Sequence, residues 1–226
     1  MTKDEKDFGF DLEPPFTMII CGNTGSGKTQ LLKHMITNEL SKKFDYIFIM
    51  CPSLEFSGDY KEFENHKKIK DNMFAEYDQE IINDIMKSQE KIIKKHGKKR
   101  CPQTLIILDD CLEYLGFGSL ISKIFFKGRH INISCIVLVQ KLKGISTLLR
   151  INTKYIVFFR TANSKELENL LDEYTGKKER KIIENELNEW FKEKWSFMFC
   201  NLKTQDFTKR YALGKDKELK YYLETS

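Results

Sequence analysis

One glycine-rich segment carries the residue types that bind a polyphosphate. It consists of Gly22, Asn23, Thr24, Gly25, Ser26, Gly27, Lys28 and Thr29. This order matches the pattern G-x-x-x-x-G-K-[ST], in which glycines let backbone N–H groups curl around a phosphate. The pattern assigns the lysine to the β- and γ-phosphates and makes the threonine hydroxyl a ligand of Mg²⁺. We therefore expect these eight residues to bind ATP together with magnesium.

A pair of carboxylates follows the apolar run 105–108, at Asp109 and Asp110. Such a run predicts a buried strand, and ligands bind at the carboxyl ends of strands in an open parallel sheet. We expect Asp109 to hold the magnesium ion, directly or through water. Asp110 is the candidate that orients and deprotonates the attacking water. Together with the glycine-rich segment, this pair predicts hydrolysis of the nucleotide.

A glutamine and two arginines are the next candidates. Gln140 ends an expected strand at 131–139 and could sense the γ-phosphate or the attacking water, although it could also cap a loop. Arg129 precedes the same strand, so we expect it on the far side of the domain, where it could reach a neighbouring subunit's nucleotide. Arg150 is a second candidate for this role, and a solvated surface arginine is the alternative for Arg129.

The elements that must position these residues alternate along the chain. We expect strands at 16–21, 46–50, 104–108, 131–139, 155–159 and 195–202. Helices are expected at 30–40, from Asp78 to about 93, and at 119–127, 145–149, 164–174 and 180–192, with no assignment for 53–77. This alternation predicts an α/β fold, a mostly parallel sheet with helices on both faces. We divide the chain into a tail (1–15), a P-loop ATPase domain (16–213) and a second tail (214–226).

Composition sets limits on the class of protein. The 226 residues are 41% hydrophobic and 31% charged, which fits one globular domain. No apolar run approaches the ~20 residues of a membrane span, and the polar start is unlike a signal peptide. The six cysteines form no C-x-x-C pair, so we expect free thiols, a reducing compartment and no structural zinc.

The net charge of +5 permits a polyanionic partner. Basic clusters lie at 66–70, 94–100 and 177–181. Each could be a solvated helix end or a contact to a phosphate backbone. Residues 94–100, with Lys141 and Lys143, are our candidates for DNA contact.

The order of parts separates subclasses of P-loop protein. A strand lies between the glycine-rich segment and the acidic strand, and paired acids end the latter, as in additional-strand, RecA-like ATPases. A GTPase should carry a base-reading N-K-x-D after a later strand, and the segment 152–155, Asn-Thr-Lys-Tyr, does not provide it.

Four segments together resemble a known family: GNTGSGKT, LIILDD, GRHINISCIVLVQ and LLRINTKYIVFF. They are similar to the FtsK-HerA superfamily, and most to its poxvirus-type genome-packaging ATPases, over residues 16–212. The resemblance implies ATP-driven translocation of double-stranded DNA into a preformed capsid by a homo-oligomeric ring, hexameric or pentameric. It implies a capsid or portal vertex as partner, and a location in the host cytoplasm or the virion. Asp110 departs from the cellular members, which usually have Glu there.

The resemblance assigns roles to the candidates already named. Lys28 and Thr29 match the phosphate and magnesium ligands, and Asp109 the metal-side acid. Asp110 matches the catalytic acid, Gln140 the sensor and Arg129 the trans-acting arginine. The competing hypotheses are a small-molecule phosphotransferase, a helicase and a regulatory ATPase.

Overall fold

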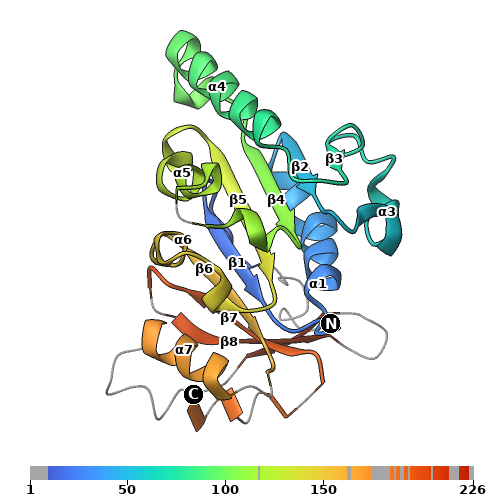
Figure 1. Cartoon of the computed structure of the whole chain (residues 1–226), viewed down its shortest axis with the longest axis vertical. Coiled ribbons are helices and arrows are strands. Elements are labelled where there is room, and N and C mark those ends of the chain that lie inside the picture. The colour runs from blue at the N-terminus through green and yellow to red at the C-terminus, as the bar shows by residue number, and fades with distance from the viewer. Residues whose placement is uncertain are drawn as a thin grey trace.

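The computed structural model describes residues 10–116, 118–161, 164–174, 184–185, 187–188, 191–192 and 194–204, and the backbone of 206–213 and 219–223. In this part of the chain, nine strands form one sheet in the order β3-β2-β4-β5-β1-β6-β7-β8-β9 (Figure 1). The strands are β1 (Thr17–Cys21), β2 (Tyr46–Met50), β3 (Met73–Phe74), β4 (Thr104–Asp109), β5 (Ile133–Val139), β6 (Tyr155–Phe159), β7 (Ser196–Asn201), β8 (Asp206–Leu213) and β9 (Leu219–Leu223).

Strands β1 to β6 are parallel, and β7, β8 and β9 pair antiparallel at one side of the sheet. The predicted α/β fold with a mostly parallel sheet is therefore confirmed. Strand β9 lies within the segment 214–226, which the sequence analysis assigned to a tail. That segment is short and rich in lysine, yet its backbone at Leu219–Leu223 extends the sheet by pairing with β8.

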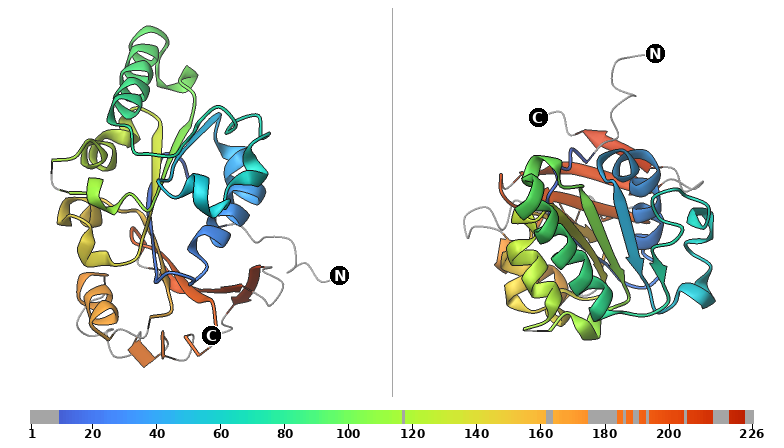
Figure 2. Two further views of the ribbon diagram at one scale, coloured as in Figure 1. Left: turned by 45° about the vertical axis from the view of Figure 1, so that its right-hand side comes forward. Right: turned by 90° about the horizontal axis from the view of Figure 1, so that it is seen from above.

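Helices cover both faces of the sheet (Figure 2). The α-helices are α1 (Lys28–Met35), α2 (Ser41–Lys43), α3 (Leu54–Ser57), α4 (Gln79–His96), α5 (Leu120–Lys127), α6 (Thr147–Ile151) and α7 (Ser164–Tyr174). A π-helical turn (Ile36–Leu40) continues α1, and single 3₁₀ turns lie at Lys61–Phe63, Lys98–Arg100, Leu112–Tyr114, Gly128–His130 and Leu142–Gly144. The helix expected at 180–192 falls largely outside the described residues.

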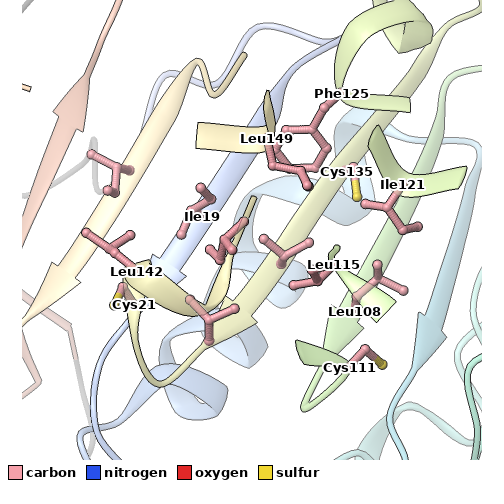
Figure 3. Packing of buried hydrophobic residues seen from close by; sticks show 14 of the residues in the cluster. Ile19, Cys21, Leu108, Cys111, Leu115, Ile121, Phe125, Cys135, Leu142 and Leu149 are labelled. Carbon is pink, nitrogen blue, oxygen red and sulfur yellow. The ribbon is translucent and has the colours of Figure 1, made fainter. Parts of the chain in front are cut away.

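Successive side chains along a strand point to opposite faces of the sheet and belong to two apolar layers. On β1, Ile19 and Cys21 join a cluster with residues of α4, α5, α6 and α7, whereas Met18 and Ile20 pack with α1 on the other face. Figure 3 shows the first cluster, where Leu149 and Phe125 lie above the strands near Cys135. This alternation follows from the period of two in a strand, and it fixes which strand ends meet at each edge of the sheet.

Helix α4 begins where the sequence predicts. The Asp78 carboxylate accepts hydrogen bonds from the N–H groups of Glu80 (2.7 Å) and Ile81 (3.1 Å), which caps the helix. Ile82 and Met86 are buried, so the apolar face of α4 packs on the sheet. Its basic end leads into the start of β4 at Thr104.

The start of the described chain packs on the domain. Phe10 and Leu12 are 2% and 1% exposed. Their N–H groups donate to the carboxylate of Glu39, at 2.9 and 3.1 Å, and Lys43 pairs with the same carboxylate at 2.7 Å. Residues 10–15, which the sequence analysis assigned to a tail, are thus held by a buried acceptor on the π-helical turn.

All six cysteines are buried free thiols. No helix in the described ranges is both long and apolar enough to cross a membrane.

Candidate nucleotide-binding site

The glycine-rich segment forms a tight loop between β1 and α1. The N–H of Gly22 donates to the carbonyl of Val139 (3.0 Å), and a Cβ at Gly22 would lie 2.7 Å from the Cβ of Phe159. Gly25 and Gly27 have positive φ, 75° and 105°, and Gly27 leads directly into α1. The loop therefore needs glycines for close approach at one position and for left-handed backbone at two others. It meets α1 at the helix N-terminus, which attracts anions.

Lys28 is the first residue of α1 and is 9% exposed. Its Nζ donates to the carbonyls of Gly22 (2.7 Å) and Asn23 (3.1 Å). Burial lowers the pKa of Lys28, while the carboxylates of Asp109 and Asp110 act to raise it. The Oγ of Ser26 is buried and has no hydrogen-bond partner among the described residues. Phosphate oxygens would therefore give the buried amine of Lys28 a negative partner and the hydroxyl of Ser26 an acceptor.

Asp109 ends β4 and is 5% exposed. Its Oδ2 accepts hydrogen bonds from the hydroxyl of Thr29 (3.3 Å) and from the phenol of Tyr60 (2.7 Å). Burial raises the pKa of Asp109, the bond from Tyr60 lowers it, and the nearby Asp110 raises it further. Two oxygen ligands of the kind that Mg²⁺ takes, Thr29 Oγ1 and Asp109 Oδ2, thus lie side by side next to the loop.

A cavity of about 370 Å³ joins the loop to these carboxylates. It is lined by Thr24, Gly25, Gly27, Lys28, Thr29, Gln30, Asp59, Asp109, Asp110, Gln140 and Trp195. Strand β5 lies between β1 and β4, so Gln140 follows a strand that separates the loop from the acidic pair. The structure therefore brings together the predicted residues Lys28, Thr29, Asp109, Asp110 and Gln140.

Within the described residues, no group of three or more His, Cys, Asp or Glu side chains could hold a metal ion. Mg²⁺ at nucleotide sites usually keeps several waters and takes one or two protein ligands plus the substrate's phosphates. The pair Thr29 and Asp109 fits that pattern.

Tyr60 is a site residue that the sequence analysis missed. It is fully buried, and its partner Asp109 lies 49 residues further along the chain. It belongs to the segment 53–77, for which no element was expected. No motif marks such a residue, because only the folding of this segment against β2 and β4 brings the phenol to the carboxylate.

The two arginine candidates lie at the opposite edge of the sheet. Arg129 and Arg150 both line a hollow of about 720 Å³ next to the start of β1, so neither reaches the glycine loop of its own chain. Arg150 forms an ion pair with Glu173 (2.7 Å) and donates to Thr147. Arg129 is exposed, and its Nε donates to His130 at 3.2 Å.

The basic candidates for DNA contact fall into two places. Lys141 and Lys143 are exposed in the turn after β5, beside Gln140 at the nucleotide edge. The basic residues 94–100 lie at the end of α4, at the other edge, where Lys98 donates to the carbonyl of Arg129 (2.7 Å).

Comparison with known proteins finds relatives in poxviruses. A family described as Poxvirus A32 protein matches residues 7–195. The DNA packaging protein OPG160 of monkeypox virus is 30% identical over 187 residues, which cover 81% of this chain and 61% of that protein. The vaccinia virus (strain Copenhagen) protein of the same name is 30% identical over 187 residues, covering 81% of this chain and 68% of its own length.

A solved structure shares the fold over nearly the whole chain. It is the genome packaging NTPase B204 from Sulfolobus turreted icosahedral virus 2 in complex with ATP-gammaS, with a TM-score of 0.61 and 16% identity. The match covers 93% of this chain and 98% of that one. The fold is thus that of a P-loop NTPase, and the match over residues 7–195 shows that this chain belongs to the poxvirus A32 protein family.

Proposed function

We propose that this chain is an ATP-hydrolysing motor that moves double-stranded viral DNA into a preformed capsid. The observation that carries the proposal is the juxtaposition of Thr29 and Asp109, whose oxygens lie 3.3 Å apart beside a lysine-centred glycine loop. The relatives support the DNA-packaging part, because two of them are named DNA packaging proteins and the related fold belongs to a genome packaging NTPase. The chain spans 61% of the monkeypox relative, so the activity of that longer protein is carried over here as a proposal.

Five residues that line the cavity have a role in this proposal. Lys28 leaves the loop carbonyls to bind the β- and γ-phosphates of ATP, and Thr29 and Asp109 hold Mg²⁺. Mg²⁺ held there would supply positive charge against the phosphate oxygens. Asp110 orients the attacking water and accepts its proton, and Gln140 contacts the γ-phosphate or that water.

The position of the two arginines at the opposite edge of the sheet supports an oligomeric active unit. Arg129 lies too far from its own loop to contact that nucleotide, so in a homo-oligomeric ring it acts on the nucleotide of the next subunit, with Arg150 as the alternative. Such an arginine stabilises charge on the transferring phosphoryl group. A pentameric or hexameric ring also encloses a channel for DNA, where lysines contact the phosphate backbone without reading sequence.

The remaining partners follow from the packaging role. The ring docks on a capsid or portal vertex, in the host cytoplasm where the virus assembles or in the virion. The host cytoplasm is a reducing compartment, which suits six buried free thiols.

ATP hydrolysis with and without linear double-stranded DNA tests the proposal. We expect DNA to stimulate phosphate release several-fold and Lys28→Ala to abolish it, while Lys87→Ala, an exposed lysine on α4, retains it. Turnover of a small phosphoryl acceptor without any DNA effect would instead identify a phosphotransferase.

The role of Arg129 has a separate test. Arg129→Ala should bind ATP normally and lose hydrolysis by about 10³-fold or more in the assembled state. Mixing Arg129→Ala with Lys28→Ala subunits should restore part of the activity, because each variant supplies what the other lacks. Normal turnover by Arg129→Ala at high protein concentration refutes the assignment.

A further inference from the structure

A second hollow adjoins the phosphate cavity, on the side of β6 and β7. It has a volume of about 210 Å³. It is lined by Asn23, Thr24, Gly25, Ser26, Phe159, Arg160, Lys194, Trp195 and Ser196. Thr24, Gly25 and Trp195 line both hollows, so the two spaces meet at the tip of the glycine loop.

Strand register explains why these residues meet. Cys21 pairs with Phe158 in the parallel ladder of β1 and β6, so the glycine loop and Arg160 leave the sheet next to each other. Strand β7 runs antiparallel to β6, and the N–H of Arg160 donates to the carbonyl of Ser196 at 3.0 Å. The start of β7 is therefore held at the nucleotide edge of the sheet, directly beside the loop.

Trp195 is the unusual residue of this hollow. Its φ is 62°, a left-handed conformation that bulky side chains rarely adopt. The side chain packs partly against the apolar layer around α1, and the Nζ of Lys194 lies 4.4 Å from the centroid of its ring. A strained backbone that holds an aromatic side chain at the mouth of a ligand cavity indicates a role in binding.

We propose that the second hollow binds the nucleobase and ribose of the nucleotide, with the base stacking on the ring of Trp195 in place of the Lys194 amine that lies over it. This inference rests on the proposed function, since Lys28 and Thr29 must hold the phosphates in the adjoining cavity. The γ-phosphate end faces Asp109, Asp110 and Gln140. The other end of the nucleotide leaves past Thr24 and Gly25, where the second hollow begins.

The chemistry of the lining fits this occupant. A base offers a flat π-face to an aromatic side chain, and the cations of Arg160 and Lys194 border the same space, where they favour the phosphate nearest the ribose. Inorganic tripolyphosphate carries the same phosphate chain without a base or ribose. It should therefore use the first cavity and not the stacking face.

The test compares two ligands on two variants of the full chain. Calorimetry measures binding of a non-hydrolysable ATP analogue and of inorganic tripolyphosphate, each with Mg²⁺. Trp195→Leu keeps apolar packing and removes the aromatic face, whereas Trp195→Phe keeps a smaller aromatic face. Tyr46→Ala, a half-exposed aromatic residue at the opposite edge of the sheet, is the control.

We expect Trp195→Leu to weaken the ATP analogue about ten-fold or more, a typical effect of losing a stacked base, and to leave tripolyphosphate within two-fold. Trp195→Phe should retain most of the affinity for the analogue, and Tyr46→Ala all of it. An equal loss for both ligands, or no loss for either, overturns the stacking role of Trp195. If the unmodified chain binds neither ligand, the proposed nucleotide site itself is wrong.

Discussion

The hydrogen bond from Tyr60 to Asp109 links the stability of the domain to the occupancy of the proposed magnesium site. Tyr60 is fully buried and its hydroxyl lies 2.7 Å from Oδ2 of a carboxylate that is itself 5% exposed. Tyr60→Phe removes this hydroxyl and keeps the ring. The carboxylate then retains only the longer bond from Thr29, at 3.3 Å, as a side-chain donor among the described contacts.

The size of the expected loss follows from the negative charge on the acceptor, Asp109. Hydrogen bonds to charged groups contribute about 1.5–3 kcal/mol net, so we expect Tyr60→Phe to lower the free energy of unfolding by about 2 kcal/mol. For a domain of this size, that loss lowers Tm by about 4–8 °C. Mg²⁺ bound at Asp109 would neutralise the carboxylate and make up for the lost donor. The deficit should therefore shrink by half or more when a saturating Mg²⁺–nucleotide analogue is present.

Thermal unfolding followed by circular dichroism, with and without Mg²⁺ and a non-hydrolysable ATP analogue, measures both effects. Tyr155→Phe is the control for the nucleotide effect, because Tyr155 is also buried but its hydroxyl accepts from the main-chain N–H of Glu13 at 3.3 Å and interacts with the Lys154 amine, away from any carboxylate of the nucleotide cavity. Its loss of stability should be unchanged by the nucleotide. The reasoning fails if Tyr60→Phe lowers the free energy of unfolding by less than about 1 kcal/mol, or if its deficit stays the same after the Mg²⁺–nucleotide is added.

Three further predictions concern other parts of the fold. Glu39→Ala leaves two buried N–H groups of the N-terminal segment without an acceptor, so urea unfolding should show a loss of about 2–5 kcal/mol; a loss below 1 kcal/mol contradicts the docking of that segment. Gly22→Ala places a Cβ 2.7 Å from a buried phenylalanine of β6, and calorimetry should show nucleotide affinity reduced at least ten-fold, whereas Gly116→Ala, with open space around it, should bind normally. Burial raises the pKa of Glu173 and Arg150 lowers it, so Arg150→Ala raises that pKa further. As pH falls from 7 to 5, Glu173 in the folded variant then takes up a proton before it does so in the unfolded chain. The difference in free energy of unfolding between Arg150→Ala and the unmodified chain should therefore be larger at pH 7 than at pH 5.

The phosphate loop and the acidic pair were predictable because their chemistry is local. Residues 22–29 are contiguous, and the order of strand, loop and helix fixes the edge of the sheet at which they lie. Asp109 and Gln140 each end a strand whose apolar run is plain in the sequence, and parallel pairing brings those ends to the same edge. The expected strands at 46–50 and 155–159 match β2 and β6.

The residues that were missed depend on contacts between distant segments. Tyr60 reaches Asp109 from a segment without regular periodicity, and Trp195 reaches the loop only because β7 returns antiparallel beside β6. Phe10 and Leu12 lie in a polar, acidic stretch that reads as a tail, and their burial depends on the acceptor provided by Glu39. A strand at the margin of the sheet, such as β9, needs only backbone pairing with β8 and carries little pattern of its own.

A structure of the chain determined with Mg²⁺ and a non-hydrolysable ATP analogue tests the central claim most directly. We predict the terminal phosphate next to the amine of Lys28, with the metal ion bound by Thr29 and Asp109 in the cavity of about 370 Å³. Nucleotide bound instead in the larger hollow beside Arg129 and Arg150, with the glycine loop empty, would contradict it.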